Sequence, residues 1–155
     1  MAGDDKQVVV ENIRSAYQEY MTAVDGLSDE QLTKPFLGTW SVREITGHII
    51  GWQEQMTIGF ERMAKGERPS PDGANWGDVQ SWNDRFAAGL GNQTARQLIG
   101  ELDGRVATMI TALQALPDDR FGEGKTANRM AEASGFGHFR EHAPEIKEAR
   151  QSGQI

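Results

Sequence analysis

The sequence contains three histidines, and their spacing points to metal chemistry. His138 and His142 are four residues apart, so on a helix they lie one turn apart on the same face. His48 stands beside an apolar stripe that continues through Ile49 and Trp52. Three imidazoles leave one position of a divalent ion open, and a catalytic metal needs such a position for water or substrate. We therefore predict a metal site formed by His48, His138 and His142.

Two features of the sequence compete with this prediction. The same spacing also fits three hydrogen-bonded polar side chains that bind no metal. Pro144 follows His142 by two residues and cannot donate to the carbonyl of Arg140, so we expect a kink or break over residues 140–144. The site can form only if that distortion falls beyond His142.

Other metal and catalytic patterns fit less well. A di-iron bundle needs Glu three residues before its histidines, and no Glu stands there. A zincin needs His-Glu-x-x-His, but position 139 is Phe. No phosphate-cradling loop, dinucleotide fingerprint or nucleophile elbow is present in the sequence.

The elements that must position the histidines are predicted to be helices. Apolar residues recur at helical spacing along most of the chain, and no alternating strand pattern appears. We predict long helices over about 8–26, 42–65, 95–116 and 126–150, a turn after Ser28, and a short helix over 79–90 inside a long crossover. This pattern predicts an all-α four-helix bundle, with residues 1–155 forming a single domain. Glu44 lies one turn before His48 and could orient it, but we favour a capping role for Glu44 with Ser41.

Composition excludes several classes of protein. The chain has 155 residues, no cysteine and a net charge of −7, so it has no disulfide, no thiolate of its own and no basic face for nucleic acid. No apolar run is long enough to span a membrane, and the N-terminus does not resemble a signal peptide, which favours a cytoplasmic protein. The chain has four tryptophans, of which we predict that Trp52 and Trp82 line a ligand pocket.

Two segments of the sequence resemble the DinB superfamily. Residues 40–52, from Trp40 through His48 to Trp52, are similar to its helix with a Trp, a short polar start and an embedded His. Residues 137–142 resemble its C-terminal His-x-x-x-His helix. The similarity in order and spacing covers essentially the whole chain. It implies an up-down-down-up bundle in which His48, His138 and His142 hold a divalent metal.

The resemblance also implies a choice between functions. Active members include transferases of low-molecular-weight thiols and a mycothiol-dependent maleylpyruvate isomerase, which implies Zn²⁺ or Ni²⁺, a thiol cosubstrate and a small electrophile. The ClbS-like branch protects against reactive natural products and need not keep the histidines, so the alternative is a metal-independent binding or resistance protein. A homodimer formed through an exposed helix face is a further expectation.

Overall fold

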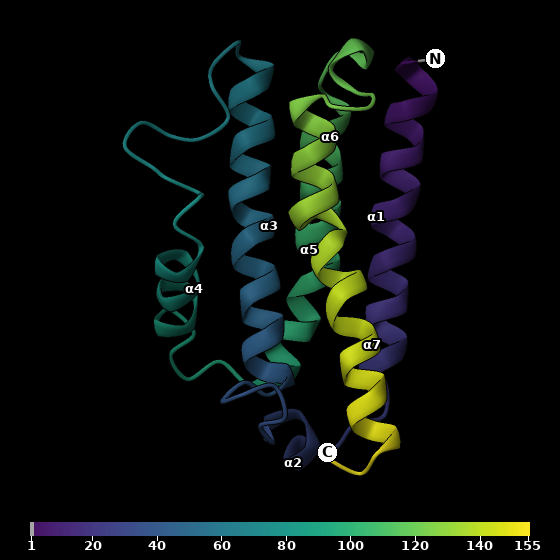
Figure 1. The fold of residues 1–155 in the computed structure, drawn as a ribbon, viewed down its shortest axis with the longest axis vertical. Coiled ribbons are helices and arrows are strands. Elements are labelled where there is room, and N and C mark those ends of the chain that lie inside the picture. Colours follow the sequence, from purple (N-terminus) through teal and green to yellow (C-terminus); the bar gives the residue numbers. More distant parts are fainter. Residues whose placement is uncertain (1) are drawn as a thin grey trace.

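The computed structural model describes residues 2–155, and their regular structure is entirely helical (Figure 1). Four long helical segments lie side by side and form a bundle. They are α1 (Ala2–Val24), α3 (Val42–Ala64), α5 (Ala95–Gln114) and a C-terminal run of α6 (Thr126–Met130), the π-turn η2 (Ala131–Gly135) and α7 (Gly137–Gln151). In Figure 1, α1 and the C-terminal run descend, whereas α3 and α5 ascend. The predicted bundle and its up-down-down-up topology are therefore confirmed.

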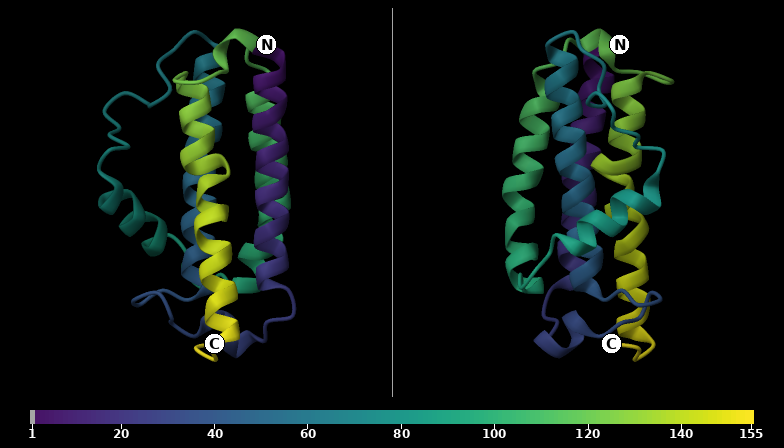
Figure 2. Two further views of the ribbon diagram at one scale, coloured as in Figure 1. Left: turned by 45° about the vertical axis from the view of Figure 1, so that its right-hand side comes forward. Right: turned by 90° about the vertical axis from the view of Figure 1, so that its left-hand side faces the viewer.

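Three short helices lie in the connections. They are α2 (Asp29–Thr33), α4 (Val79–Ala88) and the 3₁₀ turn η1 (Asp118–Arg120). The crossover between α3 and α5 carries α4 along the outside of the bundle, from one end to the other (Figure 2). The predicted short helix in the crossover is thus present. No helix within residues 2–155 is both long and apolar enough to cross a membrane.

The apolar stripes of the four segments form one buried core. The main packing pairs are α3 with α5 and α1 with α7. Tyr20, Phe60 and Phe139 are among its largest fully buried side chains. The hydroxyl of Tyr20 lies 2.7 Å from that of Thr46, which satisfies a polar group that would otherwise be costly to bury. The core fixes the helices that carry the histidines.

The start of α3 is set by a local polar contact. Oε1 of Glu44 accepts hydrogen bonds from the backbone N–H of Ser41 at 3.1 Å and from its hydroxyl at 2.8 Å. Oε2 of Glu44 pairs with Arg43. The carboxylate is thus engaged at the helix terminus, as the capping interpretation predicts. It does not orient His48.

The C-terminal run departs from the expected single helix. The expected break over residues 140–144 is absent, because α7 continues through Pro144. The irregularity lies earlier, in η2, where the N–H of Phe136 donates to the carbonyl of Ala131 at 2.8 Å. Gly137 follows directly, and a Cβ at this position would overlap the carbonyl oxygen of Glu132. A wide turn closed by a glycine therefore precedes the two histidines of α7, and such turns occur frequently at functional sites.

Candidate metal centre and adjoining pocket

The bundle brings the three predicted histidines together. His48 comes from α3, and His138 and His142 come from α7. The ring centroid of His48 lies 4.6 Å from that of His138 and 5.5 Å from that of His142, and the two α7 rings are 6.3 Å apart. His48 and His142 are buried, with 8% and 4% of their surface exposed. The fold thus places His48 beside two histidines that lie 90 or more positions further along the sequence.

A contact from the crossover fixes the orientation of His48. Oδ1 of Asn83 lies 2.9 Å from Nδ1 of His48 and 2.9 Å from the indole nitrogen of Trp52. An indole N–H can only donate, so the carbonyl oxygen of Asn83 must face both partners. Nδ1 of His48 therefore carries the proton, and the lone pair is on Nε2. Asn83 thereby selects the tautomer of His48 that can bind a metal through Nε2.

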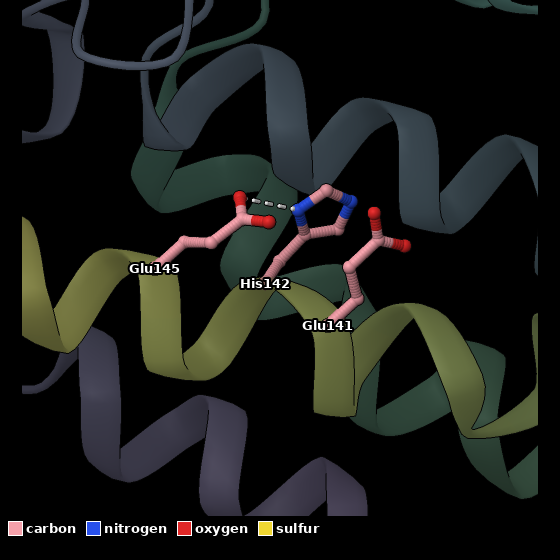
Figure 3. A group of neighbouring side chains, drawn as sticks. All are labelled: Glu141, His142 and Glu145. Carbon is pink, nitrogen blue, oxygen red and sulfur yellow. Dashed lines mark hydrogen bonds and ion pairs between the residues drawn. The ribbon is translucent and has the colours of Figure 1, made fainter.

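His142 is oriented in the same way from its own helix. Its Nδ1 lies 3.1 Å from Oε2 of Glu145 (Figure 3). A carboxylate accepts hydrogen bonds, so Nδ1 of His142 donates and Nε2 is again the free nitrogen. His138 differs, because its Nδ1 is buried and has no hydrogen-bond partner among the described residues. An unpartnered buried nitrogen is uncommon in a folded protein. The side-chain amide of buried Gln53 is unpartnered in the same way.

Burial keeps two of the imidazoles neutral. Desolvation and, to a lesser extent, the nearby His142 lower the pKa of His48 to about 4, although the hydrogen bond with Asn83 opposes the shift. Desolvation together with His48 and His142 lowers the pKa of His138 to about 3. Only a neutral imidazole has a lone pair for a metal. At neutral pH these two rings are therefore in the protonation state that a metal ligand requires.

The side chains are not yet gathered as tightly as a bound ion requires. An ion held at about 2.0–2.1 Å from each nitrogen places the nitrogens roughly 3.3 Å apart. Within residues 2–155, the three ligand atoms that lie within 4.8 Å of one another belong to Glu141, His142 and Glu145. Figure 3 shows the two carboxylates on either side of the His142 ring. Among the described residues the three histidines do not form such a group, so their nitrogens must come closer together to share one ion.

A pocket of about 560 Å³ adjoins His138. Trp52, Met56, Trp76, Met130, Ser134 and His138 are among the residues that line it. Of the two tryptophans predicted to line a ligand pocket, Trp52 lines this one and Trp82 does not. Trp82 packs against Trp52, with the two ring centroids 6.1 Å apart. Its indole N–H donates to the carbonyl of Asn75 at 2.8 Å. Its ring therefore supports the wall through Trp52.

Sequence reasoning missed two residues that orient the histidines. Glu145 could have been found, because it follows His142 by three residues and so faces it on a helix. Asn83 offers no such signal, since 35 residues separate it from His48. Its role depends on how the crossover folds back onto α3. The crossover is therefore part of the candidate site.

The fold and the site together define a class: a helical-bundle protein with converging histidines beside a small-molecule-sized pocket. The model of the DinB superfamily matches residues 12–142. The chain belongs to the DinB superfamily, as the sequence motifs indicated. No curated protein sequence matches it.

Solved structures share the fold at low sequence identity. The sibling lethal factor precursor DfsB is 15% identical, with 96% of each chain covered and a TM-score of 0.79. The colibactin self-resistance protein ClbS, solved in complex with double-stranded DNA, is 16% identical, with coverage of 94% of this chain and 95% of ClbS and a TM-score of 0.80. A protein from Escherichia coli UTI89 is 17% identical, with coverage of 97% and 95% and a TM-score of 0.80. At such identities the similarity concerns the fold alone.

Proposed function

We propose that this protein is a metal-dependent enzyme in which His48, His138 and His142 hold one divalent ion, Zn²⁺ or Ni²⁺. The observation that carries the proposal is the pair of hydrogen bonds on Nδ1. His48 and His142 each donate Nδ1–H to a side-chain oxygen, which is the arrangement that supports metal-bound histidines in proteins. The unpartnered, buried Nδ1 of His138 supports the same conclusion. Three imidazoles form a donor set that suits either ion.

The proposed reaction is transfer of a low-molecular-weight thiol to a small electrophile. His48, His138 and His142 would hold the ion, which would lower the pKa of a thiol at its open position. The sulfur must come from a cosubstrate, because the chain contains no cysteine. Sulfur forms a bond to the electrophilic carbon, the displaced electron pair moves to the leaving group or acceptor atom, and the thiol proton passes to water. Trp52 and Met56 provide an apolar wall against which the electrophile packs.

The metal proposal is tested by stoichiometry. Protein purified without a His tag is stripped with chelator, reloaded with Zn²⁺ or Ni²⁺, and analysed for bound metal. We expect about one equivalent in the wild type and less than about a tenth in His138→Gln, because removing one of three ligands from a mononuclear site abolishes tight binding. Less than about a tenth of an equivalent in the wild type under either metal contradicts the proposal.

A control variant separates the two possible ligand groups. Glu141→Gln removes an exposed carboxylate beside His142 and leaves the three histidines intact. We expect this variant to bind metal like the wild type. If Glu141→Gln loses the ion and His138→Gln keeps it, the ion belongs to Glu141, His142 and Glu145, and the histidine site is wrong.

The alternative is a metal-independent protein that binds or inactivates a reactive small molecule. The aromatic pocket and the structural similarity to the self-resistance protein ClbS favour it. Under this alternative, His138→Gln keeps full protection of cells or DNA against the reactive molecule. Under the metal-dependent proposal, protection falls with metal content. The same variant therefore decides between the two functions.

Four further expectations belong to the proposal. They are a homodimer, a cytoplasmic location, a single domain, and the absence of a nucleic-acid partner. The complex of ClbS with double-stranded DNA makes the last of these the most informative to test. Fluorescence anisotropy with a labelled duplex should show no binding at physiological salt, because a chain of net charge −7 repels the phosphate backbone. Light scattering tests the dimer.

A further inference from the structure

We propose that the pocket beside His138 binds a small molecule with a flat apolar body and one anionic group, a carboxylate or a phosphate, which Arg129 recognises. The inference rests on the proposed function and deepens it, because His138 of the proposed metal site lines this pocket. It names the chemistry of the substrate. Its evidence is independent of the metal, since it comes from the walls and the charge of the pocket.

The walls of the pocket select a flat apolar body. Trp52 and Met56 come from α3, Met130 from the C-terminal run and Trp76 from the crossover. Indole rings and thioethers pack well against aromatic ligands. The volume of about 560 Å³ lies within the range of sites that enclose drug-sized molecules. Val79 at the same pocket is half exposed, so apolar surface remains uncovered there.

The charge of the pocket selects an anion. Among the described residues that line it, Arg129 is the single arginine or lysine, and no aspartate or glutamate lines it. Arg129 uses one nitrogen, Nη2, to donate to the carbonyl of Gly124 at 3.1 Å. No carboxylate within residues 2–155 forms an ion pair with it. A guanidinium has five N–H donors, so donors remain for a carboxylate or a phosphate.

The positions of the polar groups set the length and direction of the ligand. Arg129 is exposed, whereas Ser134 is buried deeper along the same helical run. Nine residues separate Arg129 from His138, which is about 13 Å along a helix. The anionic group therefore lies near the exposed mouth, and the opposite end of the ligand lies toward Ser134 and His138. A bicyclic aromatic acid has suitable dimensions for this span.

The experiment compares charged and neutral probes on metal-free protein. Naphthalene-2-carboxylate, 2-naphthyl phosphate and the neutral naphthalene-2-carboxamide are titrated into chelator-treated protein by calorimetry. We expect the better of the two anions to bind roughly 3- to 10-fold more tightly than the amide, as a charge-assisted hydrogen bond at a partly exposed site provides. The ratio of the affinities for naphthalene-2-carboxylate and 2-naphthyl phosphate shows whether the site prefers a carboxylate or a phosphate. Equal binding of the amide and both anions, or no binding of any probe, overturns the proposal.

Substitutions at Arg129 locate the recognition. Arg129→Met removes the charge and keeps the length of the side chain, so the preference for the anion should vanish while amide binding stays unchanged. Arg129→Lys should keep part of the preference. The matched control is Arg14→Met, which removes an exposed arginine of α1 and should change nothing. If Arg129→Met keeps the wild-type preference, the assignment is wrong.

The design also separates this inference from the metal proposal. His138→Gln should lose the metal and keep the preference for the anion, because Arg129 is unaltered. If His138→Gln loses the metal but still prefers the anion, this result supports the pocket chemistry whether or not the metal proposal is right. If the wild-type protein binds a full equivalent of metal but does not prefer the anion over the amide, the pocket chemistry is wrong and the metal proposal stands. Thermal melting by circular dichroism verifies that every variant is folded.

Discussion

The bundle and the crossover are held in place by different forces. The bundle helices bury continuous apolar faces, and α3 alone buries residues along its whole length from Val42 to Met63. By contrast, α4 in the crossover has no buried residue. Yet this helix supplies Asn83, which contacts His48. Burial therefore determines where the histidines lie, whereas a few specific contacts determine how they point.

The contacts that attach α4 to the bundle are concentrated beside the site. The ring of Phe86 occupies the space where a Cβ of Gly51 would be. Phe86 also packs edge-on against Trp52, with centroids 5.5 Å apart. Trp82 also packs against Trp52 of α3, with centroids 6.1 Å apart. Because these contacts are few and half exposed, they contribute less to the free energy of unfolding than the core does. Changes in the bundle should thus alter stability, and changes in α4 should alter the site.

The largest expected effect comes from the π-turn of the bundle. Gly137→Ala places a methyl group on the carbonyl oxygen of Glu132, and backbone cannot move aside as a flexible side chain can. We expect a loss of about 2–3 kcal/mol in the free energy of unfolding, or a fall of about 5–10 °C in Tm. Urea unfolding and differential scanning calorimetry measure both quantities.

Gly104 provides the matched control for this substitution. It also lies inside a helix, α5, but a Cβ there would meet nothing within 4 Å. Gly104→Ala should stabilise the protein by up to about 1 kcal/mol through helix propensity. If both variants behave alike, then close packing at the π-turn does not hold the C-terminal run in place.

The same contrast explains how much could be predicted from the sequence. Apolar spacing was sufficient for the four long helical segments and the crossover helix, and the Ser41-x-x-Glu44 motif was sufficient for the capping role of Glu44, because burial and local caps leave a periodic or short-range signal. The spacing of His138 and His142 on one helix face belongs to the same kind of pattern. The π-turn leaves no such signal. The break expected at Pro144 was wrong, because α7 continues through this residue without the one hydrogen bond that a proline removes. Asn83 depends on tertiary packing, so no local pattern indicates it.

An intermediate effect is expected at the contact between the crossover and the site. Asn83→Leu removes the acceptor that holds Nδ1–H of His48, so His48 should populate both neutral tautomers. We expect a loss of roughly 10- to 100-fold in metal affinity, which is usual when the partner of a metal-bound histidine is removed. The Tm of the metal-free protein should change little, because α4 buries no residue. Nitrogen-15 NMR of the imidazole reports the tautomer directly.

Gln80→Leu is the control for Asn83→Leu. Gln80 is an exposed amide on the same helix, and its side chain donates to Asp84 at 2.8 Å. The control should leave both the tautomer of His48 and the metal affinity unchanged. Were Asn83→Leu to lower Tm as much as Gly137→Ala does, the distinction between a structural bundle and an orienting crossover would fail.

The smallest expected effect is the acid sensitivity of the metal-free protein. The pKa values of His48 and His138 are about 4 and about 3 in the folded state, against about 6.5 in an unfolded chain. Between these values the unfolded chain binds protons that the folded protein does not, so the free energy of unfolding decreases as the pH falls. The stability due to the neutral pair is fully present above about pH 6.5 and is lost progressively toward pH 4.

Urea midpoints measured with chelator between pH 7.5 and pH 5, above the range in which most carboxylates titrate, isolate this effect. Each histidine contributes at most about 1.4 kcal/mol per pH unit within its window. His138→Gln should reduce the slope, because one buried imidazole no longer resists protonation. Added Zn²⁺ should steepen it in the wild type, since protons compete with the ion for the same nitrogens. A midpoint independent of pH in the wild type would mean that His48 and His138 accept protons in the folded state, and burial would then not be what keeps these imidazoles neutral.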